Sequence, residues 1–246
     1  MGYVETVGAR LHYEVSGTGE ALVLLHGNGE NLDYFAAQVP AFAERFRVVA
    51  LDTRAHGEST RGDGPLDFDR LADDVCVALD ALGIDSAHVL GYSDGGNTAL
   101  TLAVRRPERV RSLIVNGANL DPSGLPWQFR IRTTLVWLVG ALVMPLSSIL
   151  APRLSPTLTR KRELLGLMVL HPHITADSLA AIAVPTLVIA GERDVIPLRH
   201  TELIADSIPG AELMIVPDAG HPCAQERPEL FNASVLEFLD HANGRG

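Results

Sequence analysis

Short apolar runs alternate with amphipathic stretches along most of this chain. Near-continuous apolar runs of the length of a buried strand occur at 21–25, 46–51, 87–90, 110–115, 185–190 and 212–216. Residues 3–7 and 10–15, on either side of Gly8-Ala9, predict a hairpin. Helical periodicity is found at 34–42, 68–82, 97–104 and 224–242. This alternation predicts an α/β fold, in which helices cover both faces of a mostly parallel, twisted, eight-stranded sheet.

One segment, residues 121–183, interrupts the alternation and has no strand pattern. We expect its prolines to divide it into short helical pieces; they are Pro122, Pro126, Pro145, Pro152, Pro156 and Pro172. The sequence therefore predicts a core formed by residues 1–120 and 184–246. Residues 121–183 are expected to form a small helical cap inserted over the functional site.

The pentapeptide Gly91-Tyr92-Ser93-Asp94-Gly95 carries the strongest chemical signal of the chain. It lies between an apolar strand pattern and a helical one. A serine at such a sharp strand-to-helix turn needs small residues two positions away on each side, and its hydroxyl is exposed at the helix N-terminus. Ser93 is therefore the candidate nucleophile. The alternative is a glycine-rich turn that carries an ordinary surface serine.

An acid and a histidine follow Ser93 in the order that this architecture requires. Asp194 comes after the strand pattern at 185–190, and His221 comes after the one at 212–216. We expect His221 to accept the proton of Ser93 and Asp194 to orient the imidazole. Each residue taken alone would be an ordinary loop residue.

The strand pattern at 21–25 leads directly into His26-Gly27-Asn28-Gly29. Glycines allow the backbone to approach a ligand closely and to point an N–H group at it. We expect the backbone N–H groups of Asn28 and Asp94 to form an oxyanion hole. His26 is interpreted as a structural residue that holds this loop.

These motifs together resemble a known family. The segments LLHGNG, LDTRAHGES, GYSDGGNTAL, PTLVIAGERDVIP and PDAGHP resemble those of α/β-hydrolase-fold serine hydrolases, in particular the small microbial esterase and peptidase-like branch. The resemblance implies Ser93 as nucleophile, Asp194 as acid and His221 as base. One departure is Ala55, because the family usually has glycine at this position in Arg-Gly-His-Gly.

The cap is unusually apolar, with no charge between residues 135 and 144. Three interpretations stay open: a helix that lines an apolar acyl pocket, a surface for a membrane or a partner chain, and a transmembrane helix. The last needs about 20 apolar residues, more than this run provides. On the first interpretation, the substrate-pocket candidates are Trp127, Trp137, Leu138 and Met144.

Asp94 has two interpretations beyond its backbone N–H. A carboxylate at a helix N-terminus is stabilised by the helix dipole. Alternatively, its side chain faces the substrate pocket and binds a cationic group such as the ammonium of an amino-acid ester.

Composition limits the function further. The chain has 246 residues and a net charge of −10, which disfavours binding to nucleic acid. Its first residues lack the pattern of a signal peptide, so we expect a cytoplasmic protein. The only cysteines, Cys76 and Cys223, provide neither a zinc site nor a disulfide framework. Cys223 is a remote alternative nucleophile, because no elbow motif presents it.

We therefore expect a hydrolase that cleaves a carboxylic ester of a small, apolar-acyl substrate through an acyl-enzyme on Ser93. No metal and no organic cofactor is expected, and the expected partner is a small-molecule substrate. The same residues could cleave an amide, thioester, lactone or carbon–carbon bond. A ligand-sensing receptor of the same fold is the alternative from another class, because fold does not dictate function. The oligomeric state stays open.

Overall fold

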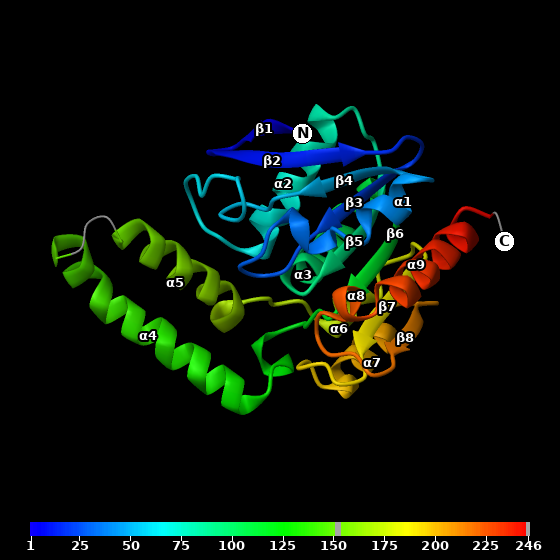
Figure 1. Cartoon of the computed structure of the whole chain (residues 1–246). Helices are drawn as coiled ribbons and strands as arrows, with labels where there is room; N and C mark the ends of the chain where they lie inside the picture. The colour runs from blue at the N-terminus through cyan, green and yellow to red at the C-terminus, as the bar shows by residue number, and fades with distance from the viewer. Residues whose placement is uncertain (151–153, 245–246) are drawn as a thin grey trace.

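The strands form one eight-stranded sheet with the order β1-β2-β4-β3-β5-β6-β7-β8 (Figure 1). The computed structural model describes residues 1–150 and 154–244. The strands are β1 Gly2–Thr6, β2 Ala9–Ser16, β3 Ala21–Leu25, β4 Arg47–Leu51, β5 Ala87–Tyr92, β6 Val110–Asn116, β7 Thr186–Gly191 and β8 Glu212–Val216. Strand β2 runs antiparallel to β1 and β4, and the other five pairings are parallel. The predicted α/β fold is confirmed.

Helices cover both faces of this sheet. The first face is covered by α2 Phe68–Ala81, α3 Asp94–Arg105, α6 Ala176–Leu179 and α7 Leu198–Ser207. The second is covered by the 3-10 helix η1 Leu32–Phe35 and by α1 Val39–Ala43, α8 Cys223–Glu226 and α9 Pro228–Ala242. Successive residues of β3 belong to opposite cores, because side chains alternate along a strand: Val23 packs on the first face and Leu24 on the second.

Two of the expected helices are interrupted. The range 34–42 contains the end of η1 and most of α1, and the range 224–242 is divided between α8 and α9. Helical backbone angles are unfavourable for a residue that precedes proline. Arg227, which precedes Pro228, has φ −134° and ψ 56° and separates the last two helices.

The segment 121–183 differs more from its prediction. Two of its helices are long, α4 Trp127–Leu150 and α5 Ser155–Leu170, and they are preceded by the short 3-10 helix η3 Pro122–Gly124. The expectation of short pieces was wrong, because α4 continues through Pro145. Pro145 and Ala141, one turn earlier, are both exposed, so water can reach the Ala141 carbonyl, to which an N–H at position 145 would otherwise donate. The expected break at Pro152 lies outside the described residues.

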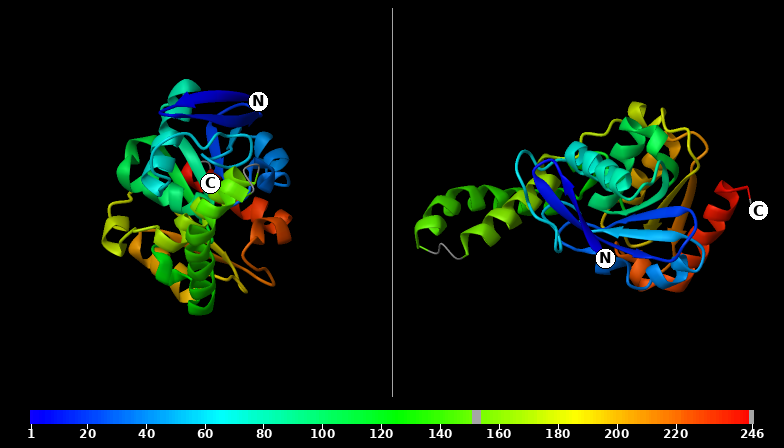
Figure 2. Two further views of the ribbon diagram at one scale, coloured as in Figure 1. Left: turned by 90° about the vertical axis from the view of Figure 1, so that its left-hand side faces the viewer. Right: turned by 90° about the horizontal axis from the view of Figure 1, so that it is seen from above.

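Helices α4 and α5 form a hairpin that projects from one end of the molecule (Figures 1 and 2). The guanidinium of Arg162 lies 4.7 Å from the ring centre of Trp137, and its Nε donates to the Trp137 carbonyl at 3.2 Å. We call this unit the α4–α5 hairpin. Among the described residues, no helix combines the length and apolarity that crossing a membrane requires.

Apolar packing anchors the end of α5 near the core. Leu164 and Leu167 pack in a small apolar cluster with Phe68, Leu71 and Ala55. Ala55 has φ 67°, a conformation in which glycine would be unstrained. Its methyl group belongs to the cluster on which α5 docks, so this departure from the family motif contributes to the attachment of the hairpin.

Candidate active site

Ser93 occupies a strained turn between β5 and α3. Its backbone angles are φ 53° and ψ −117°, and its N–H donates to the Asn116 carbonyl at 2.8 Å. A Cβ atom on Gly91 would collide with the Gly95 carbonyl, and one on Gly95 would collide with the Leu25 carbonyl. The two glycines are therefore required by the close approach of backbone around the serine.

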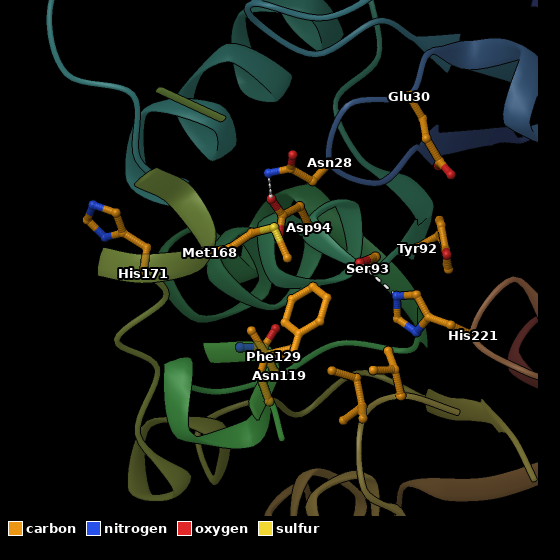
Figure 3. Close-up of a pocket in the computed structure, with 13 residues that line it drawn as sticks. Asn28, Glu30, Tyr92, Ser93, Asp94, Asn119, Phe129, Met168, His171 and His221 are labelled. Atoms are coloured by element: carbon orange, nitrogen blue, oxygen red, sulfur yellow. Dashed lines mark hydrogen bonds between the residues drawn. The ribbon is translucent and has the colours of Figure 1, made fainter. Parts of the chain in front are cut away.

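The structure brings Ser93, His221 and Asp194 together from three loops beyond the carboxyl ends of β5, β8 and β7. Nε2 of His221 lies 3.0 Å from Oγ of Ser93 (Figure 3). Nδ1 of the same imidazole lies 2.7 Å from Oδ1 of Asp194. An imidazole held between a hydroxyl and a carboxylate can accept the hydroxyl proton while the carboxylate stabilises the resulting cation.

Neighbouring groups fix the orientation of this pair. Oδ1 of Asp194 also accepts the N–H of Ile196 at 2.8 Å, and the ring of Tyr92 packs against His221 with 5.0 Å between centres. Gly117, which follows β6, has φ 64°. A Cβ atom on it would lie 2.9 Å from Cε1 of His221. The sequence reasoning missed Gly117, and its only signal was a glycine at the end of a strand.

The side chain of Asn28 connects the loop after β3 to two other elements. Its Nδ2 donates to Oδ2 of Asp94 at 2.7 Å and to the Leu164 carbonyl of α5 at 2.8 Å. Within the described part of the chain, the backbone N–H groups of Asn28 and Asp94 donate to no protein acceptor. Both amides therefore keep a free donor, as an oxyanion hole requires.

Asp94 is buried at the N-terminus of α3 and also lines the cavity beside Ser93. Burial raises the pKa of its carboxyl to about 6, although hydrogen bonds from Asn28 and Asn97 oppose this effect. The location is compatible with both interpretations of Asp94. Its oxygens already accept two amide hydrogen bonds, so a cationic substrate group would have to share them.

The surroundings of His26 and Cys223 decide between the interpretations given for these two residues. Nδ1 of His26 donates to the Gly27 carbonyl at 2.8 Å if the proton is on that nitrogen, and Nε2 accepts the N–H of Thr53 at 3.1 Å. Burial lowers the pKa of His26, which agrees with a neutral, structural imidazole. Cys223 is fully buried, and burial raises the pKa of its thiol to about 12, so it is unsuited to act as a nucleophile.

A cavity of about 370 Å³ opens in front of Ser93 (Figure 3). Its residues are Asn28, Glu30, Tyr92, Ser93, Asp94, Asn119, Leu125, Phe129, Met168, His171, Val195, Ile196 and His221. Its apolar side chains come from the loop after β7, from Leu125 and from the ends of α4 and α5 near the core. Burial raises the pKa of Glu30. In the described residues, no group of three or more histidines, cysteines and carboxylates is arranged to hold a metal ion.

The cap residues that were predicted to line the pocket are not brought to this cavity. Trp127 is 64% exposed and Leu138 is 47% exposed, whereas Trp137 packs on Arg162 and Met144 lies farther along α4. The apolar run leads away from the serine, so only the first turns of α4 can reach the substrate. Phe129 does so, and no periodicity or spacing distinguished it in the sequence.

Comparisons with known proteins identify the family of the chain. The family model described as alpha/beta hydrolase fold matches residues 20–142. RutD of Azorhizobium caulinodans, which is named as a candidate carbamate hydrolase, is 32% identical over 97% of this chain and 98% of its own length. The chain belongs to the α/β-hydrolase fold family.

Solved structures of this α/β-hydrolase family extend the agreement to the whole chain. A hydrolase from Pseudomonas aeruginosa PA01 is 33% identical, with a TM-score of 0.79 and 97% coverage of both chains. Est816, described as an N-acyl homoserine lactone degrading enzyme, is 29% identical with a TM-score of 0.78. The two alignments cover 97% and 96% of this chain. The chain is therefore a hydrolase of this fold.

Proposed function

We propose that this chain is a serine hydrolase that cleaves an acyl bond of a small substrate through an acyl-enzyme on Ser93. One observation carries the proposal: Ser93, His221 and Asp194 are linked by contacts of 3.0 and 2.7 Å at the mouth of a cavity. No other serine of the described chain is hydrogen-bonded to a histidine at this cavity.

In the first half-reaction, Oγ of Ser93 attacks the substrate carbonyl while its proton passes to Nε2 of His221. Asp194 holds the other ring nitrogen and stabilises the imidazolium. The oxygen of the tetrahedral intermediate takes up negative charge and accepts hydrogen bonds from the amides of Asn28 and Asp94. His221 then gives the proton to the leaving group as that bond breaks, which leaves the acyl group on Ser93.

In the second half-reaction, water replaces the leaving group. His221 takes a proton from the water molecule, whose oxygen attacks the acyl carbonyl, and the same proton returns to Ser93 as the acid is released. Each proton that His221 accepts is given up within the same half-reaction. The cycle therefore needs no cofactor.

A carboxylic ester is the substrate class that we propose first. The cavity is bounded by Leu125, Phe129, Met168, Val195 and Ile196, so it offers apolar contacts to an acyl chain. The names of RutD and Est816 make a carbamate and an acyl-homoserine lactone the next substrates to examine.

Steady-state hydrolysis of para-nitrophenyl esters from acetyl to dodecanoyl tests the proposal. Ser93→Ala is expected to abolish turnover across the series. The control is Ser207→Ala, because the hydroxyl of Ser207 donates to the Leu203 carbonyl within α7 and serves only that helix. Turnover that survives in Ser93→Ala would contradict the assigned nucleophile.

A fluorophosphonate probe separates an intact nucleophile from an unsuitable ester. We expect a covalent adduct on Ser93, identified by peptide mass spectrometry, in the wild-type chain and in Ser207→Ala but not in Ser93→Ala. Labelling without turnover on esters, carbamate or lactone would favour the ligand-sensing receptor over the hydrolase.

A further inference from the structure

The outer side of α4 is apolar and faces solvent. Ile131, Leu135, Leu138 and Leu142 follow one another at spacings of four, three and four residues, so they share one stripe of the helix. Their side chains are 52, 56, 47 and 80% exposed. Monomeric soluble proteins seldom expose contiguous apolar stripes of this kind without using them for binding.

The opposite side of α4 packs against α5. Thr133 is buried, and Trp137 and Gly140 contact Arg162. These residues lie half a turn from the stripe of Ile131 to Leu142, so the contact with α5 leaves that stripe uncovered. One side of α4 therefore stabilises the α4–α5 hairpin by packing on α5, and the other side is exposed to solvent.

The charge of the hairpin is opposite to that of the molecule. Residues 127–170 contain six arginines and lysines and a single acidic residue, whereas the whole chain has a net charge of −10. The acidic residue, Glu163, is paired with Arg61 of the core at 2.9 and 3.0 Å. Arg130 and Arg132, on either side of Ile131 at the start of the stripe, are exposed, whereas Arg160 lines a second cavity with Glu30 and Asp33 of the core.

We propose that the α4–α5 hairpin docks on an anionic lipid surface. Exposed apolar side chains flanked by basic ones are the features with which a helix binds in the interface of a bilayer. Long basic side chains can keep their charge at the headgroups while apolar neighbours enter the acyl region. The hairpin lies in the surface layer and does not cross the membrane.

Charge distinguishes this occupant from a second copy of the chain. A second hairpin would offer Arg130 and Arg132 no free carboxylate, because its single acidic residue, Glu163, is paired with Arg61 of the core. Anionic headgroups would instead neutralise these charges. The hairpin projects from one end of the molecule (Figure 2).

Docking there would bring the cavity close to the lipid. Phe129 in the first turn of α4 and Met168 in the last turns of α5 line the cavity in front of Ser93. The roots of the same two helices whose outer parts contact lipid therefore border the cavity. The docking itself is independent of catalysis, so it stands or falls separately from the proposed hydrolase activity.

Co-sedimentation with vesicles tests the proposal. The full chain would be mixed with vesicles of phosphatidylcholine alone or of phosphatidylcholine with phosphatidylglycerol, at low and at high salt. Leu142→Glu removes the most exposed leucine of the stripe and adds a like charge to the lipid. The matched control is Leu203→Glu on α7, which is 44% exposed and lies outside the hairpin.

We expect wild type and Leu203→Glu to sediment with the anionic vesicles, less so at high salt. Leu142→Glu is expected to lower the partition coefficient at least about tenfold. An Arg130→Glu/Arg132→Glu double variant should lower it as well. Thermal unfolding of each variant verifies that it is folded, and repeating the assay with Ser93→Ala verifies that docking does not need hydrolysis.

The proposal is overturned if wild type stays in the supernatant with both kinds of vesicle, or if Leu142→Glu sediments like wild type. Sedimentation velocity adds a third decisive outcome. A dimer that Leu142→Glu dissociates, together with no vesicle binding, would make a second copy the occupant of the stripe and exclude the lipid surface.

Discussion

The sheet edge around Ser93 and the α4–α5 hairpin lie next to each other but are held in place very differently. Ser93 is fixed by a turn in which backbone approaches backbone from several strands, and both nitrogens of His221 are engaged. The stripe on α4 that includes Leu142 is in contact with solvent. The first region is determined by many mutual contacts, whereas the outer part of the hairpin is held by one seam between two helices.

This difference separates the consequences of substitution. A small change at the sheet edge displaces groups that have no alternative position. It should therefore lower kcat or the free energy of unfolding. A change on the outer side of the hairpin should alter only the binding properties of that surface. The following predictions test this contrast, beginning with the largest effect.

Asp194→Asn should have the largest effect on turnover. An amide next to Nδ1 of His221 favours the wrong tautomer and cannot stabilise the imidazolium, so kcat should fall by a factor on the order of 10⁴. The control is Glu192→Gln in the same loop, because Glu192 accepts only the N–H of Asp218. Ester hydrolysis that is equally reduced in both variants would contradict the assigned role of Asp194.

Gly117→Ala should lower kcat by on the order of 10²-fold, because its methyl group would push His221 away from Ser93. Gly210→Ala is a matched control, since Gly210 has a similar φ of 73° but nothing within 4 Å of its Cβ position. Both variants should lose about 1 kcal/mol of stability from the strained φ. Only Gly117→Ala should lose activity, and unchanged kcat would show that the loop adapts.

Asp94→Asn should change how stability depends on pH. The pKa of Asp94 in the folded chain is about 6, above its ordinary value of 3.8. Its contribution to stability is therefore complete below about pH 4 and is lost as the pH rises through about 6, by about 2–3 kcal/mol. Urea unfolding between pH 4 and 7 should show this loss in wild type and in the exposed control Asp85→Asn, but not in Asp94→Asn.

A substitution on the hairpin should have the smallest effect. Leu138→Ala, on the outer side of α4, is expected to change the free energy of unfolding by less than about 0.5 kcal/mol. Leu90→Ala in the fully buried strand β5 should cost about 2–5 kcal/mol. Chemical denaturation of the two variants measures the contrast, and a loss of 2 kcal/mol or more in Leu138→Ala would mean that the stripe is covered in solution.

The sequence was sufficient for the sheet and for the residues at its edge. Parallel strands place their carboxyl ends together, so strand patterns that end before Ser93, Asp194 and His221 already predict that these side chains meet. The prediction needed no knowledge of packing. Their catalytic roles remain the proposal that Ser93→Ala and Asp194→Asn will test.

The sequence was not sufficient for the cap. Apolar character indicates burial, yet Leu138 and Trp127 are exposed to solvent. The local sequence does not determine which side of an apolar helix packs against the core. Pro145 likewise predicted a helix end, but α4 continues through it. In an exposed helix, water can replace the one backbone hydrogen bond that proline removes. Phe129 and Met168 reach the cavity only because of the way in which the hairpin joins the core.

The position of the hairpin between β6 and β7 divides the catalytic set along the chain. Ser93 precedes His221 by 128 residues, and Asp194 also lies on the far side of the hairpin. A chain cut within the hairpin would leave one fragment with the nucleophile and another with the acid and base. The fragments would still share the parallel β6–β7 ladder. If they reassemble when they are co-produced, recovered ester hydrolysis would report the meeting of two proteins fused to them, and the absence of recovery would show that the covalent link is needed for folding.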